Sequence, residues 1–186
     1  MNITRVLLVI MVISGCSRQP SLPGNTSTFV DISEFTSSEL NWLTSEQPDL
    51  LKRSNWQGTS KTDTLNHVDW EKELYPFLEL NIKPTVWSTD FTLSDSMVFD
   101  NKIIRTYRTT NPRQRVKEFQ ITTLMADGSI ERLEATIEDH TRLTSSNQQI
   151  SLTRGVGYSL AGLRKTKMLG NEDYQLIGQY LTKNND

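Results

Sequence analysis

The spacing of apolar residues divides the chain into regions of different character. Residues 6–13 form an unbroken apolar run, whereas residues 17–28 contain two prolines, one glycine and few apolar side chains. From residue 29 to about residue 84 apolar residues recur at helical spacing, and from residue 86 onward they alternate with polar residues as in strands. Since neither a repeat nor a second linker interrupts residues 29–186, the pattern predicts a single domain there, preceded by a flexible tether at residues 16–28.

The first half of this domain carries the signals of helices. Asp31 and Ser33 are overlapping candidates for the cap of a predicted helix that ends near Gln47, before Pro48; Glu34 follows Asp31 by three residues, as in a capping box. A short second helical piece is expected around residues 48–51. A polar loop is expected at residues 55–62.

A further helix is predicted over residues 63–80, because four apolar residues in this segment share one helical face. They are Trp70, Leu74, Phe77 and Leu78, at positions i, i+4, i+7 and i+8. Pro76 has no amide proton to bond to the carbonyl of the preceding turn, so the helix should kink or restart there.

The second half of the domain has the alternation of antiparallel strands. In the clearest hairpin, residues 116–139, a three-residue turn at residues 127–129 would pair Phe119 with Ile137. Further strands are expected at residues 149–154, 159–169 and 173–181. Since no helical pattern separates these strands, they should be antiparallel. The predicted fold class is α+β, with an N-terminal helical layer packed on a C-terminal antiparallel β-meander.

Composition and charge argue against several classes of function. The chain has 20 Lys and Arg residues against 22 Asp and Glu residues, a net charge of −2, so no excess of positive charge favours binding to nucleic acid. Its single cysteine cannot form an internal disulfide, and its two histidines are too few for a histidine-rich metal site.

Two clusters contain a histidine beside acidic residues, and neither pattern converges on one ion. On a helix, His67 would share a face with Glu71, while Asp69 would lie on another face. Asp139 and His140 are adjacent on a predicted strand and would point to opposite faces. Serine never occurs within a Gly-x-Ser-x-Gly motif. We therefore predict no metal site, no catalytic residues and no enzymatic activity.

The N-terminus carries the most specific motif in the chain. A short head with one arginine, Arg5, precedes the apolar run of residues 6–13, which is too short to span a bilayer, since a spanning helix needs about 20 residues. The run ends in Ile13-Ser14-Gly15-Cys16, which resembles the lipobox of bacterial lipoproteins. The resemblance implies that residues 1–15 are a signal peptide, that cleavage falls between Gly15 and Cys16, and that Cys16 carries a covalent lipid as the only cofactor.

Lipidation of Cys16 implies a membrane anchor, because one acyl chain binds a bilayer only marginally whereas several bind it stably. Ser17 follows the cysteine in place of an aspartate, which resembles the pattern of Gram-negative lipoproteins sorted to the outer membrane. We therefore expect an outer-membrane lipoprotein whose domain faces the periplasm; the inner membrane and the cell surface are the alternatives. The body, notably residues 69–84 and 174–180, resembles small Gram-negative envelope lipoproteins of uncharacterised function, and this resemblance implies no activity.

The tryptophans provide the remaining candidate site, because all four lie in the first half of the chain. A candidate apolar groove between helices and sheet comprises Trp70, Leu74, Phe77 and Trp87; the alternative is that these side chains fill the core. The first hypothesis of function is a non-enzymatic binding or scaffolding domain whose partner is an envelope protein or another envelope component. The second is a carrier of an apolar ligand such as lipid. Carriers that sort lipoproteins are similar in setting an antiparallel sheet against helices around an apolar cavity.

Overall fold

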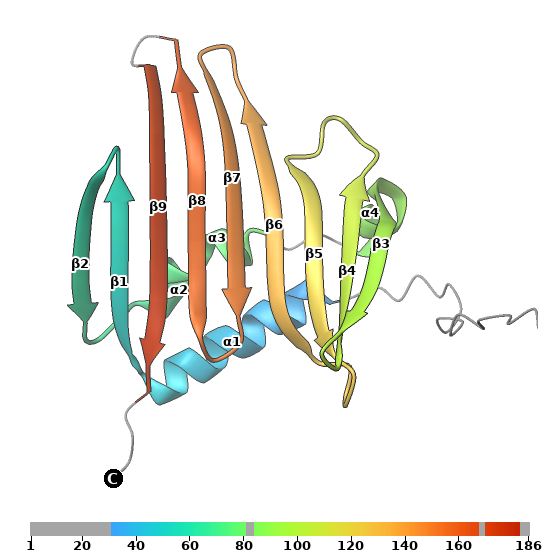
Figure 1. Cartoon of the computed structure of the whole chain (residues 1–186), viewed down its shortest axis with the longest axis horizontal. Helices are drawn as coiled ribbons and strands as arrows, with labels where there is room; N and C mark the ends of the chain where they lie inside the picture. The colour runs from blue at the N-terminus through green and yellow to red at the C-terminus, as the bar shows by residue number, and fades with distance from the viewer. Residues whose placement is uncertain (1–30, 81–83, 168–169, 183–186) are drawn as a thin grey trace, which may run out of the picture.

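A nine-stranded antiparallel sheet dominates the computed structural model, which describes residues 31–80, 84–167 and 170–182 (Figure 1). The strands are β1 (Asp49–Trp56), β2 (Thr59–Leu65), β3 (Phe91–Phe99), β4 (Lys102–Thr109), β5 (Val116–Leu124), β6 (Ile130–His140), β7 (Thr144–Thr153), β8 (Gly157–Thr166) and β9 (Gly170–Leu181). The helices are α1 (Ile32–Glu46), α2 (Trp70–Glu73), α3 (Tyr75–Leu78) and α4 (Pro84–Asp90). Within the described residues, none of these helices combines the length and apolar character that crossing a bilayer requires.

The sheet joins strands that are close in sequence with one pair that is far apart. From β3 to β9 each strand pairs with the next, which confirms the predicted antiparallel arrangement of the C-terminal strands. The β1–β2 hairpin extends the sheet at its other side, because β1 pairs with β9 from Asp49 opposite Leu181 to Trp56 opposite Tyr174. The two edges of the sheet are therefore β2 and β3.

The prediction of an N-terminal helical layer packed on a C-terminal meander is wrong. The helical piece expected at residues 48–51 and the loop expected at residues 55–62 fall in β1, β2 and the turn between them. The helix expected over residues 63–80 also begins later than predicted, because residues 63–65 belong to β2 and α2 starts at Trp70. In this turn Gln57 and Gly58 both have positive φ, 49° and 81°, as in the tight turns of hairpins with two-residue loops. The first half of the chain thus adds two strands to the same sheet, and α1 is the one helix longer than seven residues among those described.

The β5–β6 hairpin forms where predicted, but with a different register. Phe119 lies opposite Ala135 instead of Ile137, because the loop contains five residues, 125–129, instead of three. Gly128, with φ of 74°, donates its amide hydrogen to the carbonyl oxygen of Leu124 and closes this loop at 2.9 Å. A shift by two residues leaves each side chain on its predicted face, since faces alternate with a period of two.

The helix ends follow local rules that the sequence already shows. Asp31 caps α1 by accepting a hydrogen bond from the backbone amide of Glu34 at 3.0 Å, which confirms the predicted start. The helix ends at Gln47, whose left-handed backbone precedes Pro48. The predicted restart at Pro76 is also confirmed, because α2 stops before Leu74 and α3 begins with Pro76 in its first turn.

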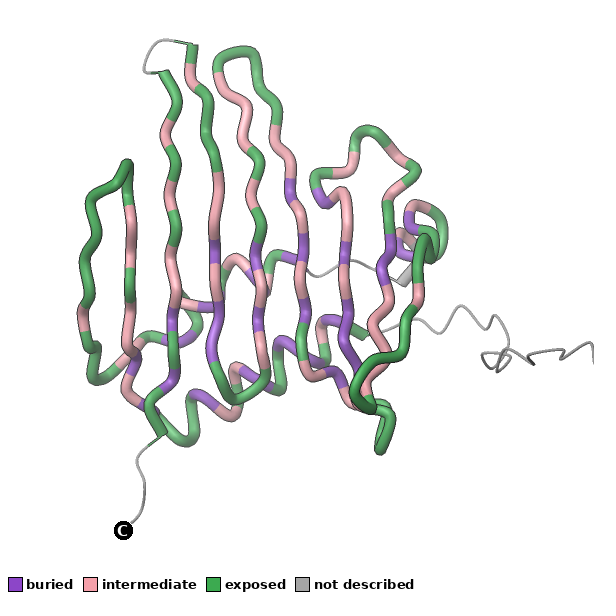
Figure 2. The backbone as a smooth tube through the Cα atoms, in the orientation of Figure 1, coloured by how far each residue is buried: buried purple, intermediate pink, exposed green. Residues whose placement is uncertain are grey.

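The core lies between the helices and one face of the sheet. Phe119, Ile121 and Leu133 of the sheet belong to the same buried cluster as Phe35 and Leu43 of α1, and the buried positions concentrate in the half of the strands beside α1 (Figure 2). Each such side chain stabilises the fold by roughly 1.5–3 kcal/mol when it is fully removed from water. The sheet is therefore held by one face, and its other face is left to contact solvent or a partner.

Candidate functional site

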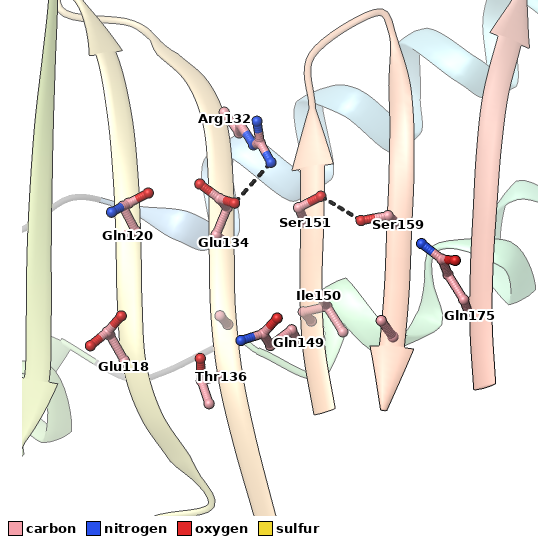
Figure 3. A pocket seen from close by; sticks show the side chains of 12 residues that line it. Glu118, Gln120, Arg132, Glu134, Thr136, Gln149, Ile150, Ser151, Ser159 and Gln175 are labelled. Carbon is pink, nitrogen blue, oxygen red and sulfur yellow. Dashed lines mark hydrogen bonds and ion pairs between the residues drawn. The ribbon is translucent and has the colours of Figure 1, made fainter. Parts of the chain in front are cut away.

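The two faces of the sheet differ in character. Leu133 lies opposite Ile121 of β5 and Leu152 of β7, and these three side chains face the helices. The next residue, Glu134, points the other way. In Figure 3 the helices lie behind the sheet, and the polar side chains around Glu134 project from the other side. We call this second side the open face.

Side chains on the open face form two rows that cross the strands. Because partners in the register share a face, the rows can be followed from strand to strand. One row contains Gln120, Glu134, Ser151 and Ser159, and the next contains Glu118, Thr136, Gln149, Ala161 and Gln175. Neighbouring strands are about 4.8 Å apart, and the two rows are separated by about 7 Å along each strand.

The two rows line a shallow hollow of about 370 Å³, which we call the polar hollow (Figure 3). The Arg132 guanidinium donates to the Glu134 carboxylate at 2.8 Å, and the hydroxyls of Ser151 and Ser159 bond to each other at 2.9 Å. The side chain of Gln149 makes no hydrogen bond to the described residues. The polar hollow therefore offers free amide groups beside a balanced ion pair.

This arrangement suits binding better than nucleophilic chemistry. A serine becomes a nucleophile when a general base lies within hydrogen-bond reach, and the Ser151 hydroxyl is instead bonded to the Ser159 hydroxyl. No histidine lines the polar hollow. Among the described residues, no group of three His, Cys, Asp or Glu side chains is placed to hold a metal ion.

In both histidine clusters an aspartate carboxylate makes local hydrogen bonds. The Asp69 carboxylate caps α2 by accepting from the backbone amide of Lys72 at 3.3 Å, and its pKa is lowered mainly by the hydrogen bond from the Lys72 side chain. The Asp139 carboxylate accepts two hydrogen bonds from the Arg115 guanidinium, at 2.6 and 2.9 Å. His140 lies 3.7 Å from Glu138 on the same face of β6.

All four residues of the candidate apolar groove are buried. Trp70 contacts Tyr180 edge-on at 5.4 Å between ring centroids, and it belongs with Leu74 and Phe77 beside β8 and β9. Trp87 lies in a separate aromatic cluster, 5.1 Å from Phe119 and close to two rings of β3 and β4. The structure thus brings three of the four together. None of them lines any of the hollows described here.

The predicted lipidation and cleavage residues lie outside the described part of the chain. Cys16, Gly15 and the rest of residues 1–30 have no described structure. The first described residue, Asp31, is the cap of α1. The anchor therefore stays a prediction from the sequence.

A buried polar network lies beneath α2. The Glu73 carboxylate accepts hydrogen bonds from the Tyr158 hydroxyl and from the Lys52 ammonium, the latter at 2.6 Å. Burial, followed by this hydrogen bond to a carboxylate, raises the pKa of Tyr158 far above its ordinary value. Two further buried atoms, Trp70 Nε1 and Tyr180 Oη, have no hydrogen-bond partner among the described residues.

Glu39 is the one buried carboxylate on α1. It accepts a hydrogen bond from the backbone amide of Gly155 at 2.8 Å, which ties α1 to the β7–β8 turn. Burial raises the pKa of Glu39, although this hydrogen bond and the charge of Arg154 oppose the increase. The group therefore gains a proton more readily in the folded chain than in the unfolded one.

Two further hollows lie between the helices and the sheet. The α1 hollow, about 650 Å³, is lined among others by Asp31, the cap of α1, by Phe35 of α1, by Ile103 of β4 and by Met125 of the β5–β6 loop. The α3 hollow, about 480 Å³, has an apolar floor and a polar rim. Its floor consists of Leu80, Val86, Val116 and Ile137, and its rim includes Arg113 and Arg115.

The residues of the polar hollow were not among the sites predicted from the sequence. Their signal was present as the polar half of the alternation, because Glu134 and Thr136 separate the apolar residues of β6. Alternation identifies the residues that point away from the core, but it does not show which of them meet across β6, β7 and β8.

No family model, curated protein or solved structure matches this chain. The function therefore has to be argued from the chain's own residues. The polar hollow, the two helix–sheet hollows and the N-terminal motif are the features that carry such an argument.

Proposed function

We propose that this protein is an outer-membrane lipoprotein, anchored through Cys16 with its domain in the periplasm. The support is the sequence from Arg5 to Cys16, in which a positive head, a short apolar run and two small residues precede the only cysteine. Ser17 supports outer-membrane sorting.

Two substitutions test the anchor and its destination separately. Cys16→Ala should abolish acyl labelling and release the protein from membranes, whereas Ser17→Asp should keep the lipid and move the protein to the inner membrane. Ser17→Ala is the matched control and should behave as the natural chain. Membrane fractionation combined with acyl labelling measures the outcome for all three variants. A Cys16→Ala chain that stays acylated and membrane-bound contradicts the proposal.

We further propose that the domain binds a polar envelope component on the open face, without catalysis. The observation that carries this is the asymmetry of the sheet: one face packs against the helices, and the other holds the polar hollow with unpaired amides at Gln149 and Gln175. Such amides both donate and accept, so they suit an extended partner rich in amide or hydroxyl groups. The rows across β5–β9 would let the partner run perpendicular to the strands.

Site-specific photo-crosslinking in cells tests this site. A crosslinking residue at Gln149 should give a discrete adduct, because Gln149 lies in the polar hollow. Ser159→Trp, which fills the hollow from the neighbouring strand, should remove that adduct without changing the circular dichroism spectrum. The control position is Lys61, whose exposed side chain lies on the edge strand β2. No adduct at Gln149, or one that survives Ser159→Trp, contradicts the proposal.

A carrier of apolar ligand is the second candidate, and the α3 hollow favours it. Its floor of four apolar residues under a rim that includes Arg113 fits a molecule with an apolar body and an anionic head, whereas Arg115 on the same rim is already paired with Asp139. Native mass spectrometry of the body from Ser17 to Asp186, secreted without lipid, should show a lipid-sized adduct. Val116→Trp should remove the adduct and Ser159→Trp should not; a bare mass for the natural chain contradicts this candidate.

A further inference from the structure

Exposed apolar side chains gather at one end of the sheet, where β3 ends. Met97, Val98 and Phe99 are 52, 52 and 70% exposed, and Met125, in the β5–β6 loop, is 53% exposed. The Met125 amide donates to the carbonyl oxygen of Asn101 at 3.0 Å, which holds this loop against the β3–β4 turn. We call these four residues the apolar tip.

The fold gives no internal reason for the apolar tip. Since faces alternate along a strand, Met97 and Phe99 point to one face of β3 and Val98 to the other, so both faces of its end are apolar. Edge strands are usually protected by charged side chains or proline, whereas this end exposes its largest apolar residue, Phe99. Clusters of this kind mark contacts with proteins or membranes.

The apolar tip lies beside the point at which the described chain begins. Met125 lines the α1 hollow together with Asp31, the cap of α1, and both the start of α1 and the β3–β4 turn lie at the same end of the molecule (Figure 1). Figure 2 shows that most of β3 and this turn is exposed. Leu143, which is equally exposed, lies in the β6–β7 turn at the opposite end of the sheet.

The length of chain before Asp31 limits how far this end can move from an anchored Cys16. Fourteen residues, 17–30, separate the two. A flexible chain of that length spans about 20 Å on average and at most about 50 Å when extended. An anchored domain would therefore keep the apolar tip close to the bilayer at a high effective concentration.

We propose that the apolar tip inserts into the headgroup boundary of the same leaflet that holds the lipid on Cys16, and so sets the orientation of the domain. This inference rests on the lipid anchor of the proposed function. An end-on contact with lipid needs apolar groups at the tip, and Met97, Val98, Phe99 and Met125 provide four of them there, although other apolar side chains, such as Leu143 and Val156, are exposed elsewhere. A strand added along β3 would instead meet the register shift between Leu93 and Asp95.

The charges that flank the apolar tip in the sequence, Asp100 and Lys102, provide no attraction for an anionic headgroup, so we expect the contact to depend on apolar burial. Lys102 is paired with Glu131 at 2.9 Å, so it is not free to bind an anionic headgroup. Asp100, in the β3–β4 turn, would be repelled by anionic lipid. Insertion should therefore be as complete in high salt as in low salt.

The test uses the acylated full chain in vesicles of phosphatidylethanolamine and phosphatidylglycerol. The lipid occupies the sulfur of Cys16, so Phe99→Cys and Leu143→Cys each introduce a single free thiol for a nitroxide label. The label at residue 99 should become accessible to oxygen and lose its accessibility to a water-soluble nickel complex. The matched label at residue 143 should remain accessible to nickel, and Met125→Cys should reproduce the result at residue 99.

Three other results would overturn the proposal, and each can be distinguished from the others. A protein that fails to float with the vesicles refutes the anchor and the inference together. A protein that floats, with equal nickel accessibility at residues 99 and 143, overturns insertion and leaves the anchor standing. Spin–spin broadening at residue 99 would identify a second copy as the occupant of the apolar tip, and it also overturns the proposal.

Discussion

Two tyrosines in the core provide a matched test of the buried polar network. Tyr158 donates its hydroxyl hydrogen to the Glu73 carboxylate, whose side chain is 15% exposed, whereas the buried Tyr180 hydroxyl has no partner among the described residues. Phenylalanine at either position keeps the ring, and with it the contact of Tyr158 with Phe77 or of Tyr180 with Trp70. The two substitutions therefore differ in one respect: Tyr158→Phe removes a hydrogen bond, whereas Tyr180→Phe removes a buried hydroxyl without a partner among the described residues.

The two substitutions should change the free energy of unfolding differently. A hydrogen bond to a charged group contributes about 1.5–3 kcal/mol, so Tyr158→Phe should lower the free energy of unfolding by that amount. A buried hydroxyl without a partner is itself a cost, so Tyr180→Phe should leave stability unchanged or raise it by about 1 kcal/mol. In a domain of this size each kcal/mol corresponds to roughly 2–4 °C in the melting temperature.

Urea unfolding followed by tryptophan fluorescence and circular dichroism measures both changes. Equal slopes against urea concentration would show that only stability has changed. If Tyr180→Phe destabilises the domain as much as Tyr158→Phe does, the Tyr180 hydroxyl has a partner and the reasoning is refuted. The same holds if Tyr158→Phe has no effect.

Two further predictions concern backbone packing and pH. Gly157→Ala should lower the free energy of unfolding by about 3 kcal/mol, because a Cβ there would collide with the backbone carbonyl oxygen of Gly178. Gly58→Ala, with open space around it, should lower it by about 1 kcal/mol through its positive φ. Equal losses in urea titrations would contradict this. Because burial raises the pKa of Glu39, its contribution to stability is complete below the unfolded pKa and is lost as pH rises through the folded pKa. Glu39→Gln should therefore flatten that decline in unfolding experiments across pH. Asp90→Asn should act in the opposite direction, removing a contribution that is lost as pH falls, because hydrogen bonds from Gln114 and Asn111 lower the pKa of Asp90.

The C-terminal strands were predictable because one face of each is packed. In β6, Leu133, Ala135 and Ile137 are buried and alternate with polar residues, and this is the pattern that indicates a half-buried strand. The hairpin register was not predictable, since a three-residue loop at residues 127–129 and the observed five-residue loop at residues 125–129 keep the same faces.

The β1–β2 hairpin was missed because its strands bury little. Beyond Leu50, β1 carries Lys52, Arg53 and Ser54, and no residue of β2 is buried, so apolar alternation is absent. Backbone hydrogen bonds join β2 to β1 and β1 to β9, and the long-range pairing with β9 leaves no local pattern in the sequence.

The candidate site was likewise hidden in tertiary pairing. The polar residues of β6 and β7 were visible as alternation, but the meeting of Glu134, Ser151 and Ser159 depends on the registers of three strands. Local periodicity determines the face of a residue and not its cross-strand neighbour.

The pairing of β1 with β9 also has a consequence for the order in which the chain can fold. Strands β3 to β9 can assemble by successive short-range hairpins, whereas β1 must wait for a strand that is synthesised more than a hundred residues later. This pairing raises the contact order and places loop closure late in folding. While β9 is absent, the edge of β1 that later pairs with β9 stays unpaired, so a chain that is still being synthesised would expose it. The sheet can thus be completed only after β9 has been synthesised.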